Sequence, residues 1–113
     1  MKELIKNILK PLNIPVRFQY YSGSEPTYIT FFSYLDKGEL YGDDKELGIG
    51  YYIQLDIFSK TNYTDIVKQV NKLMEDGGFT KRSSGPELFE DDTKLYHKPL
   101  KFFFYKENNK EEI

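Results

Sequence analysis

The chain of 113 residues contains no cysteine and no tryptophan, and it has a single histidine, His97. Without cysteine, neither a disulfide framework nor a thiolate metal site can form. With one histidine, a nucleophilic triad is limited to a serine, His97 and a carboxylate. No serine lies in the Gly-x-Ser-x-Gly elbow that exposes a nucleophile. These absences exclude the best-defined catalytic and metal-binding signatures.

Long apolar runs and an excess of one charge are also lacking. No apolar run approaches the roughly 20 residues of a membrane span, and the N-terminus lacks the apolar core of a signal peptide. The 16 basic and 18 acidic residues give a formal net charge of -2. Such a balance creates no general attraction to nucleic acid or anionic membranes, although local patches remain open. We therefore expect one soluble, cytoplasmic domain with no membrane partner.

Aromatic residues are the excess in this composition, with ten Tyr and nine Phe. Most of them lie in runs typical of strands, because Tyr and Phe suit a pleated, half-buried surface. Tyr also suits interfaces, since it joins apolar area to a polar tip. We expect some of these rings to be covered by partner proteins.

Hydrophobic periodicity predicts two helices. The first occupies the segment before Pro11, where apolar residues recur at helical spacing. The second begins after Thr61 or Asn62, either of which can cap it, and ends at Gly77 and Gly78. Its apolar stripe comprises Ile66, Val67, Val70, Leu73 and Met74. Both helices are amphipathic, so each is expected to cover a sheet.

Alternating patterns predict strands at residues 13–21, 27–36, 51–60, 79–84 and 94–105. Residues 37–48 are polar and glycine-containing, and we interpret them as a long hairpin loop or flexible arm. Pro99 predicts an edge or a bulge in the last strand. The order α-β-β-β-α-β-β indicates an α+β fold, with a mostly antiparallel sheet and both helices on one face. Residues 1–105 would form the single domain, and residues 106–113 a frayed polar tail.

Residues 85–99 contain four acidic residues, Glu87, Glu90, Asp91 and Asp92, close to His97. Carboxylates and imidazole bind metals, so one interpretation is a small metal-dependent hydrolase. The other is a hydrated turn followed by a structural histidine, because Asp favours turns and the spacing matches no metal loop. We favour the turn, and expect no catalytic residue, metal or cofactor.

Basic residues offer a second alternative, a nucleic-acid-binding regulatory module. Lys81 and Arg82 lie on one strand, with Lys94, Lys98 and Lys101 on its expected neighbour. Clustered cations would attract phosphates, whereas dispersed ones would form an ordinary charged strand face. Five tyrosines raise a related question, because exposed rings can stack bases: Tyr28, Tyr34, Tyr41, Tyr51 and Tyr52. The acidic loop around them favours a core and protein-contact role for these rings instead.

Three stretches together resemble a known family: "VRFQYYSGSEPTYITFFSYLD", "YYIQLDIFSKTNYTDIVKQVNKLMEDGGF" and "PELFEDDTKLYHKPLKFFFY". They are similar to the tail completion, or tail terminator, proteins of long-tailed bacteriophages and Gram-positive prophages. The resemblance covers residues 14–105. It depends on a Q-x-D-I-F-S-K strand end, a helix ending in G-G-F and a T-K-L-Y-H-K strand.

The resemblance implies a structural virion protein with no catalytic residue. Such proteins assemble, typically as hexameric rings, on the last ring of the tail tube, stop its growth and receive the head connector. DNA passes through the ring without sequence-specific binding. The implied location is the tail-neck junction of the virion, and the host cytoplasm during assembly. For subunit or partner contacts we expect Tyr34, Leu35, Leu40 and Tyr41, and for the lumen or neck surface Lys81, Arg82 and Lys98.

Overall fold

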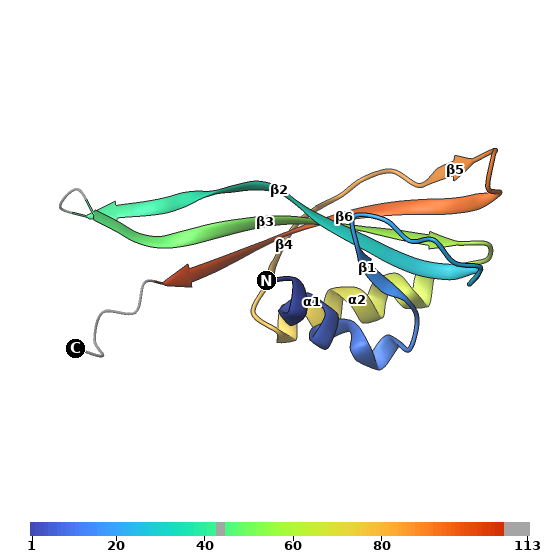
Figure 1. Cartoon of the computed structure of the whole chain (residues 1–113), viewed down its shortest axis with the longest axis horizontal. Coiled ribbons are helices and arrows are strands. Elements are labelled where there is room, and N and C mark those ends of the chain that lie inside the picture. The colour runs from blue at the N-terminus through green and yellow to red at the C-terminus, as the bar shows by residue number, and fades with distance from the viewer. Residues whose placement is uncertain (43–44, 108–113) are drawn as a thin grey trace.

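A computed structural model describes residues 1–42 and 45–107, with side chains for residues 1–34 and 48–106. The predicted α+β class with a mostly antiparallel sheet is confirmed (Figure 1). The elements are α1 (Lys2–Leu9), the short 3-10 helix η1 (Lys10–Leu12), β1 (Val16–Phe18), β2 (Thr27–Gly42), β3 (Lys45–Ser59), α2 (Thr64–Asp76), β4 (Thr80–Ser84), β5 (Leu88–Glu90) and β6 (Leu95–Glu107).

The six strands form one mixed sheet in the order β1-β2-β3-β6-β4, and β5 also pairs with β6. β1 is parallel to β2, and every other pair is antiparallel. β4 and β5 follow each other along one side of β6, since Ser84 pairs with Leu100 and Leu88 with His97. The sequence predicted five strands and missed β5, because three residues are too few to show an alternating pattern.

The prediction of a loop at residues 37–48 is wrong for residues 37–42 and 45–48, and residues 43–44 lie outside the described residues. β2 and β3 continue as paired strands as far as Gly42 and Lys45, and β6 accompanies β3 up to the pair Gly48–Glu107. Register shifts after Ser33 and Gly38 interrupt the two-residue period that identifies a strand. This part of the sheet extends beyond the helices in Figure 1, and the molecule measures 52 × 24 × 24 Å.

One core joins both helices to the sheet, and Figure 1 shows α1 and α2 on the same side of it. α1 contributes Ile5 and Leu9, and α2 contributes Val70 and Met74. The buried strand residues of this core are Val16, Ile29, Phe31, Ile53, Leu55, Ile57, Leu100 and Phe102. Each large apolar side chain contributes about 1.5–3 kcal/mol by leaving water, so this face of the sheet supplies most of the folding free energy.

Pro99 does not mark an edge, because β6 has neighbours on both sides. It lies opposite Asp56 of β3, and on its other side its carbonyl accepts a hydrogen bond from the Gly85 amide at 2.9 Å. The nitrogen and carbonyl of a strand residue point to the same neighbour. The missing N–H of Pro99 therefore faces the gap between β4 and β5, where no ladder bond is lost.

Candidate functional site

The sheet face opposite the core carries the candidate functional residues and is called the open face here. Side chains alternate along each strand, so the residues between the core positions point to this face. Neither of the helices α1 and α2 lies over it (Figure 1). Its central residues are Tyr28, Thr30, Phe32 and Tyr34 of β2, Tyr52, Gln54, Asp56 and Phe58 of β3, and His97, Lys101 and Phe103 of β6.

A first aromatic row, Tyr21, Tyr28, Phe58 and His97, crosses the open face near the β1–β2 connection. The ring centroids of Tyr21 and Tyr28 are 4.4 Å apart, those of Tyr28 and Phe58 4.9 Å, and those of Phe58 and His97 4.3 Å. Burial, helped by Glu90 and Tyr21, raises the pKa of the Tyr28 hydroxyl. Tyr21 covers this end of the face, so the first row is partly an internal layer.

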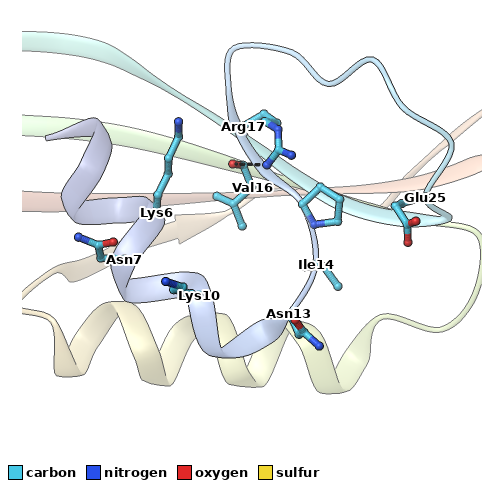
Figure 2. A pocket seen from close by; sticks show the side chains of 9 residues that line it. Lys6, Asn7, Lys10, Asn13, Ile14, Val16, Arg17 and Glu25 are labelled. Atoms are coloured by element: carbon cyan, nitrogen blue, oxygen red, sulfur yellow. Dashed lines mark hydrogen bonds between the residues drawn. The ribbon is translucent and has the colours of Figure 1, made fainter.

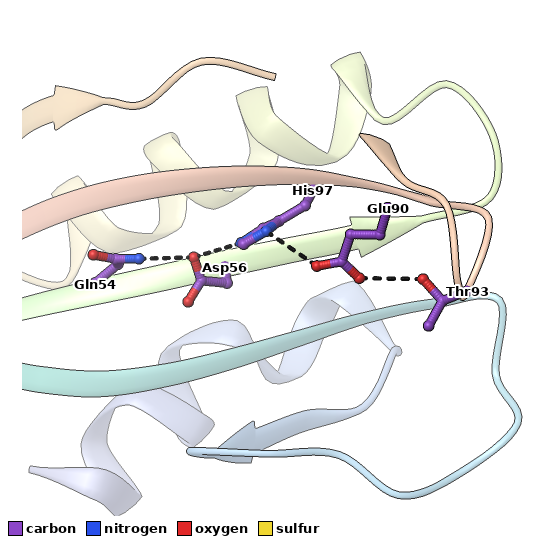
Figure 3. Close-up of polar contacts among 5 residues, drawn as sticks. All are labelled: Gln54, Asp56, Glu90, Thr93 and His97. Carbon is purple, nitrogen blue, oxygen red and sulfur yellow. Dashed lines mark hydrogen bonds and ion pairs between the residues drawn. The ribbon is translucent and has the colours of Figure 1, made fainter. Parts of the chain in front are cut away.

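A polar network lies beside the first row (Figure 3). His97 Nε2 is 2.8 Å from Asp56 Oδ1, and the Gln54 side-chain amide donates to the same oxygen at 2.9 Å. A carboxylate only accepts hydrogen bonds, so Nε2 is the donor. The other ring nitrogen, Nδ1, faces Glu90 Oε2 at 3.6 Å. Because Asp56 is only 6% exposed, these donors offset the cost of its burial and link β3, β5 and β6.

The acidic cluster of residues 85–99 is divided by the fold. Glu90 approaches His97, whereas Glu87 accepts a hydrogen bond at 2.6 Å from the hydroxyl of Tyr63, next to the start of α2. Asp91 and Asp92 are exposed in the turn before β6. In the part of the chain that the structure describes, no three His, Asp or Glu residues are grouped to hold a metal ion. The geometry is that of a hydrated turn and a packed histidine.

The hydroxyl of Tyr63 has a more strongly shifted pKa than that of Tyr28. Its side chain is 9% exposed, and its hydroxyl donates to Glu87. Burial, the hydrogen bond to Glu87 and the negative charge of Glu87 raise its pKa well above the usual 10.0. The contact joins the β4–β5 connection to α2, so Tyr63 has a structural role.

A second aromatic row, Tyr34, Tyr52 and Phe103, crosses the open face closer to the extended end of the sheet. The ring centroids of Tyr34 and Tyr52 are 5.8 Å apart, and those of Tyr52 and Phe103 5.0 Å. Lys101 Nζ is 5.0 Å from the Tyr34 centroid, and the Arg82 guanidinium is 5.8 Å from that of Tyr52. Aromatic rings and arginine are enriched at protein interfaces. Tyr34 is 38% exposed, while Tyr52 and Phe103 are half-buried, so one end of this row lies at the surface.

The residues predicted for subunit contacts are placed only in part. Tyr34 belongs to the second aromatic row. Leu35, Leu40 and Tyr41 are in β2, but their side chains lie outside the described residues. Sequence reasoning named Tyr52 among the tyrosines with a core or protein-contact role, but it did not place Tyr52 beside Tyr34, and it missed Phe103. Alternation assigns a residue to a face but does not give the register between strands.

The three predicted basic residues do not form one surface. Arg82 lies beside the rings of Tyr52 and Phe103 on the open face. Lys98 pairs in register with the buried Ile57 and therefore points to the helix side, where its Nζ donates to the Gly85 carbonyl at 2.7 Å. Lys81 is exposed opposite Phe102 of the core face. Lys81 and Arg82 are adjacent in β4, so alternation places them on opposite faces of the sheet.

Comparison with known proteins returned no family model and no curated protein that matches this chain. Among the described residues, neither helix has the length and apolar character needed to cross a membrane.

The second aromatic row, with Arg82 and Lys101, is the feature of the described fold that best indicates a function.

Proposed function

We propose that the protein is a tail terminator, a structural subunit that forms a ring on the end of a phage tail tube and joins the tail to the head. The role is non-enzymatic and belongs to the tail-neck junction of the virion. The partners are further copies of the chain, the tail tube protein and the head connector protein. The sequence resemblance over residues 14–105 suggests this function, and the surface of the fold supports it.

The observation that carries the proposal is the second aromatic row. Tyr34, Tyr52 and Phe103 lie in contact on a face that α1 and α2 leave uncovered, with two cations over the rings. Exposed patches of this kind mark binding sites on soluble proteins. A side chain such as Tyr34 loses little rotamer freedom on binding and keeps its hydroxyl at the rim. This surface is suited to a repeated protein contact.

The resemblance to tail terminators suggests a ring, and the shape of the subunit is compatible with one. With helices on one face and an aromatic surface on the other, and with a sheet extended at one end, the two sides of the subunit differ. Contact between two different surfaces is heterologous, and it closes into a ring when the rotation between subunits allows. We propose a hexamer, with DNA passing through its centre without base recognition.

Light scattering after size exclusion, across a wide range of protein concentration, tests the proposal. We expect a discrete species near six protomers. Tyr34→Asp places a charge in the second aromatic row and should shift the protein to monomer. Asp92→Lys, in the exposed turn before β6 and on neither face of the sheet, is the matched control and should leave the ring intact.

The same assay defines the contrary result. A protein that stays monomeric is next mixed with purified tail tubes, and capping of the tube ends by the wild-type chain, but not by Tyr34→Asp, would still support the proposal. A monomer that binds neither itself nor tail tubes contradicts it.

A further inference from the structure

The edge of the molecule formed by α1, η1 and β1 is basic. A groove of about 630 Å³ is lined by Lys6, Lys10 and Arg17, together with the amide side chains of Asn7 and Asn13 (Figure 2). Glu25 is the one carboxylate among the lining residues. The volume falls in the range of small-ligand sites, which span roughly 300–1,000 Å³.

The secondary structure arranges these cations in a row. Lys2, Lys6 and Lys10 recur every fourth residue, so they share one side of the helical segment at intervals of about 6 Å. This side faces β1, because Lys2 Nζ lies 4.2 Å from the ring centroid of Phe18. Arg17 directly precedes Phe18 in β1. Its guanidinium donates a hydrogen bond to the Val16 carbonyl at 3.2 Å, and this bond orients the Arg17 side chain (Figure 2).

The three cations of the groove, Lys6, Lys10 and Arg17, outnumber its single carboxylate, Glu25. Of the ion pairs between described side chains, none involves Lys6, Lys10 or Arg17. Like charges in a concave surface reinforce each other's potential and concentrate anions there. The site is therefore electropositive although the whole chain has a formal net charge of -2.

Aromatic side chains continue the groove. A second cavity of about 400 Å³ shares Lys6 and Arg17 with the first and adds Phe18, Tyr20 and Tyr21. Tyr20 is 72% exposed, the most exposed of the large apolar side chains that the structure describes. A tight turn holds it there, since Gln19 has φ 73° and the Tyr20 amide donates to the Phe18 carbonyl at 2.9 Å. An exposed ring thus stands next to two cations.

We propose that this edge binds single-stranded nucleic acid, with backbone phosphates on Lys6, Lys10 and Arg17 and a base stacked on Tyr20. A basic groove with adjacent aromatic rings is the combination that binds single strands without sequence preference. An acidic peptide would use the cations but would leave the Tyr20 ring without a matching group. The inference goes beyond the proposed ring function, does not depend on it, and uses other residues than Lys81, Arg82 and Lys98.

Fluorescence anisotropy of a labelled oligothymidylate with the full chain, between about 50 and 200 mM salt, tests the proposal. Three phosphate contacts predict a slope of log affinity against log salt of about −2. The double variant Lys6→Gln, Arg17→Gln should reduce the slope to about −0.7. Tyr20→Ala should weaken binding about tenfold and leave the slope unchanged.

A control variant and three contrary results complete the test. Lys68→Gln with Lys72→Gln removes two exposed cations of α2 and should change neither affinity nor slope. Lack of binding at about 50 mM salt would overturn the proposal, as would an unchanged slope in the double variant. If inorganic polyphosphate binds as tightly as the oligonucleotide and Tyr20→Ala has no effect, the site is a simple anion site and the nucleic-acid proposal fails. Circular dichroism confirms that each variant is folded.

Discussion

At the scale of single residues, Tyr63 shows how a buried polar group makes stability depend on pH. The ring belongs to the core cluster, while its hydroxyl reaches Glu87 at 2.6 Å. Ionising this hydroxyl would place a negative charge beside a carboxylate in a poorly solvated position, which explains its raised pKa. The neutral form therefore stabilises the fold.

The consequence appears at alkaline pH. A group whose pKa is raised by folding contributes its full stability below the unfolded pKa, about 10 for tyrosine, and loses it as the pH rises toward the folded value. We expect the free energy of unfolding to fall between pH 9 and pH 11 in urea denaturation. Tyr63→Phe should reduce that fall, at a cost of about 1 kcal/mol near neutral pH for the lost hydrogen bond. An identical alkaline slope in wild type and variant would contradict the role assigned to Tyr63.

At the scale of elements, the end of α2 depends on glycine for a conformational reason. Gly77 follows the last helical residue, and Gly78 has φ 99°, a region that residues with a Cβ rarely occupy. A Cβ at Gly78 would also lie 3.3 Å from the Phe104 ring. The chain turns here from α2 to Phe79, whose ring is buried in the core.

Gly78→Ala should therefore destabilise the protein by about 1 kcal/mol or more, because the new side chain is strained where φ is positive. Thermal and urea unfolding measure the loss. Lys72→Ala is the control, since it removes only an exposed ion pair with Asp76 and should change stability by less than about 0.5 kcal/mol. Equal stability of Gly78→Ala and wild type would show that the turn is not constrained as described.

The helices and strands differ in how well the sequence predicts them. α2 follows from its pattern, but the predicted cap at Thr61 or Asn62 is wrong, because Tyr63 is the N-cap residue and no side chain caps the helix. The Asn62 side chain accepts a hydrogen bond from the Thr64 amide at 2.8 Å in the turn just before α2. The core strands follow from alternation. The extension of β2 to Gly42 and of β3 back to Lys45 was missed, because strand pairing uses the backbone and does not require alternating side chains.

The candidate site was predicted less completely than the fold. Tyr34 was identified, but Tyr52 and Phe103 depend on the register of three strands, which a sequence pattern does not specify. His97 was expected to be packed or hydrogen-bonded, and it is both, since it stacks on Phe58 and contacts Asp56. Its partner Asp56 lies 41 residues away in the sequence and meets it only through the β3–β6 pairing.

At the scale of the whole molecule, the extended sheet makes the subunit long for its size. The Cα radius of gyration is 15.9 Å. A compact domain of this length would have about 13 Å. The difference comes from the part of β2, β3 and β6 that reaches past the helices (Figure 1).

Small-angle X-ray scattering on the monomeric species, or on Tyr34→Asp if wild type forms a ring, checks this shape. We expect a radius of gyration near 16 Å and an asymmetric distance distribution. A value near 13 Å would mean that the extended strands fold back in solution, and it would contradict the proposed contact geometry.

The pairing of β3 with β6 has a further consequence during synthesis. β6 is the last strand along the sequence, yet it pairs with β3 from Gly48 to Ser59. At about 5–20 residues per second, a ribosome needs about 2 to 10 s to proceed from the end of β3 to the end of β6. Throughout that interval β3 has an unpaired edge, able to join the β3 strand of another nascent chain. The strand that is best protected in the finished protein is thus the one most exposed to aggregation while the protein is being made.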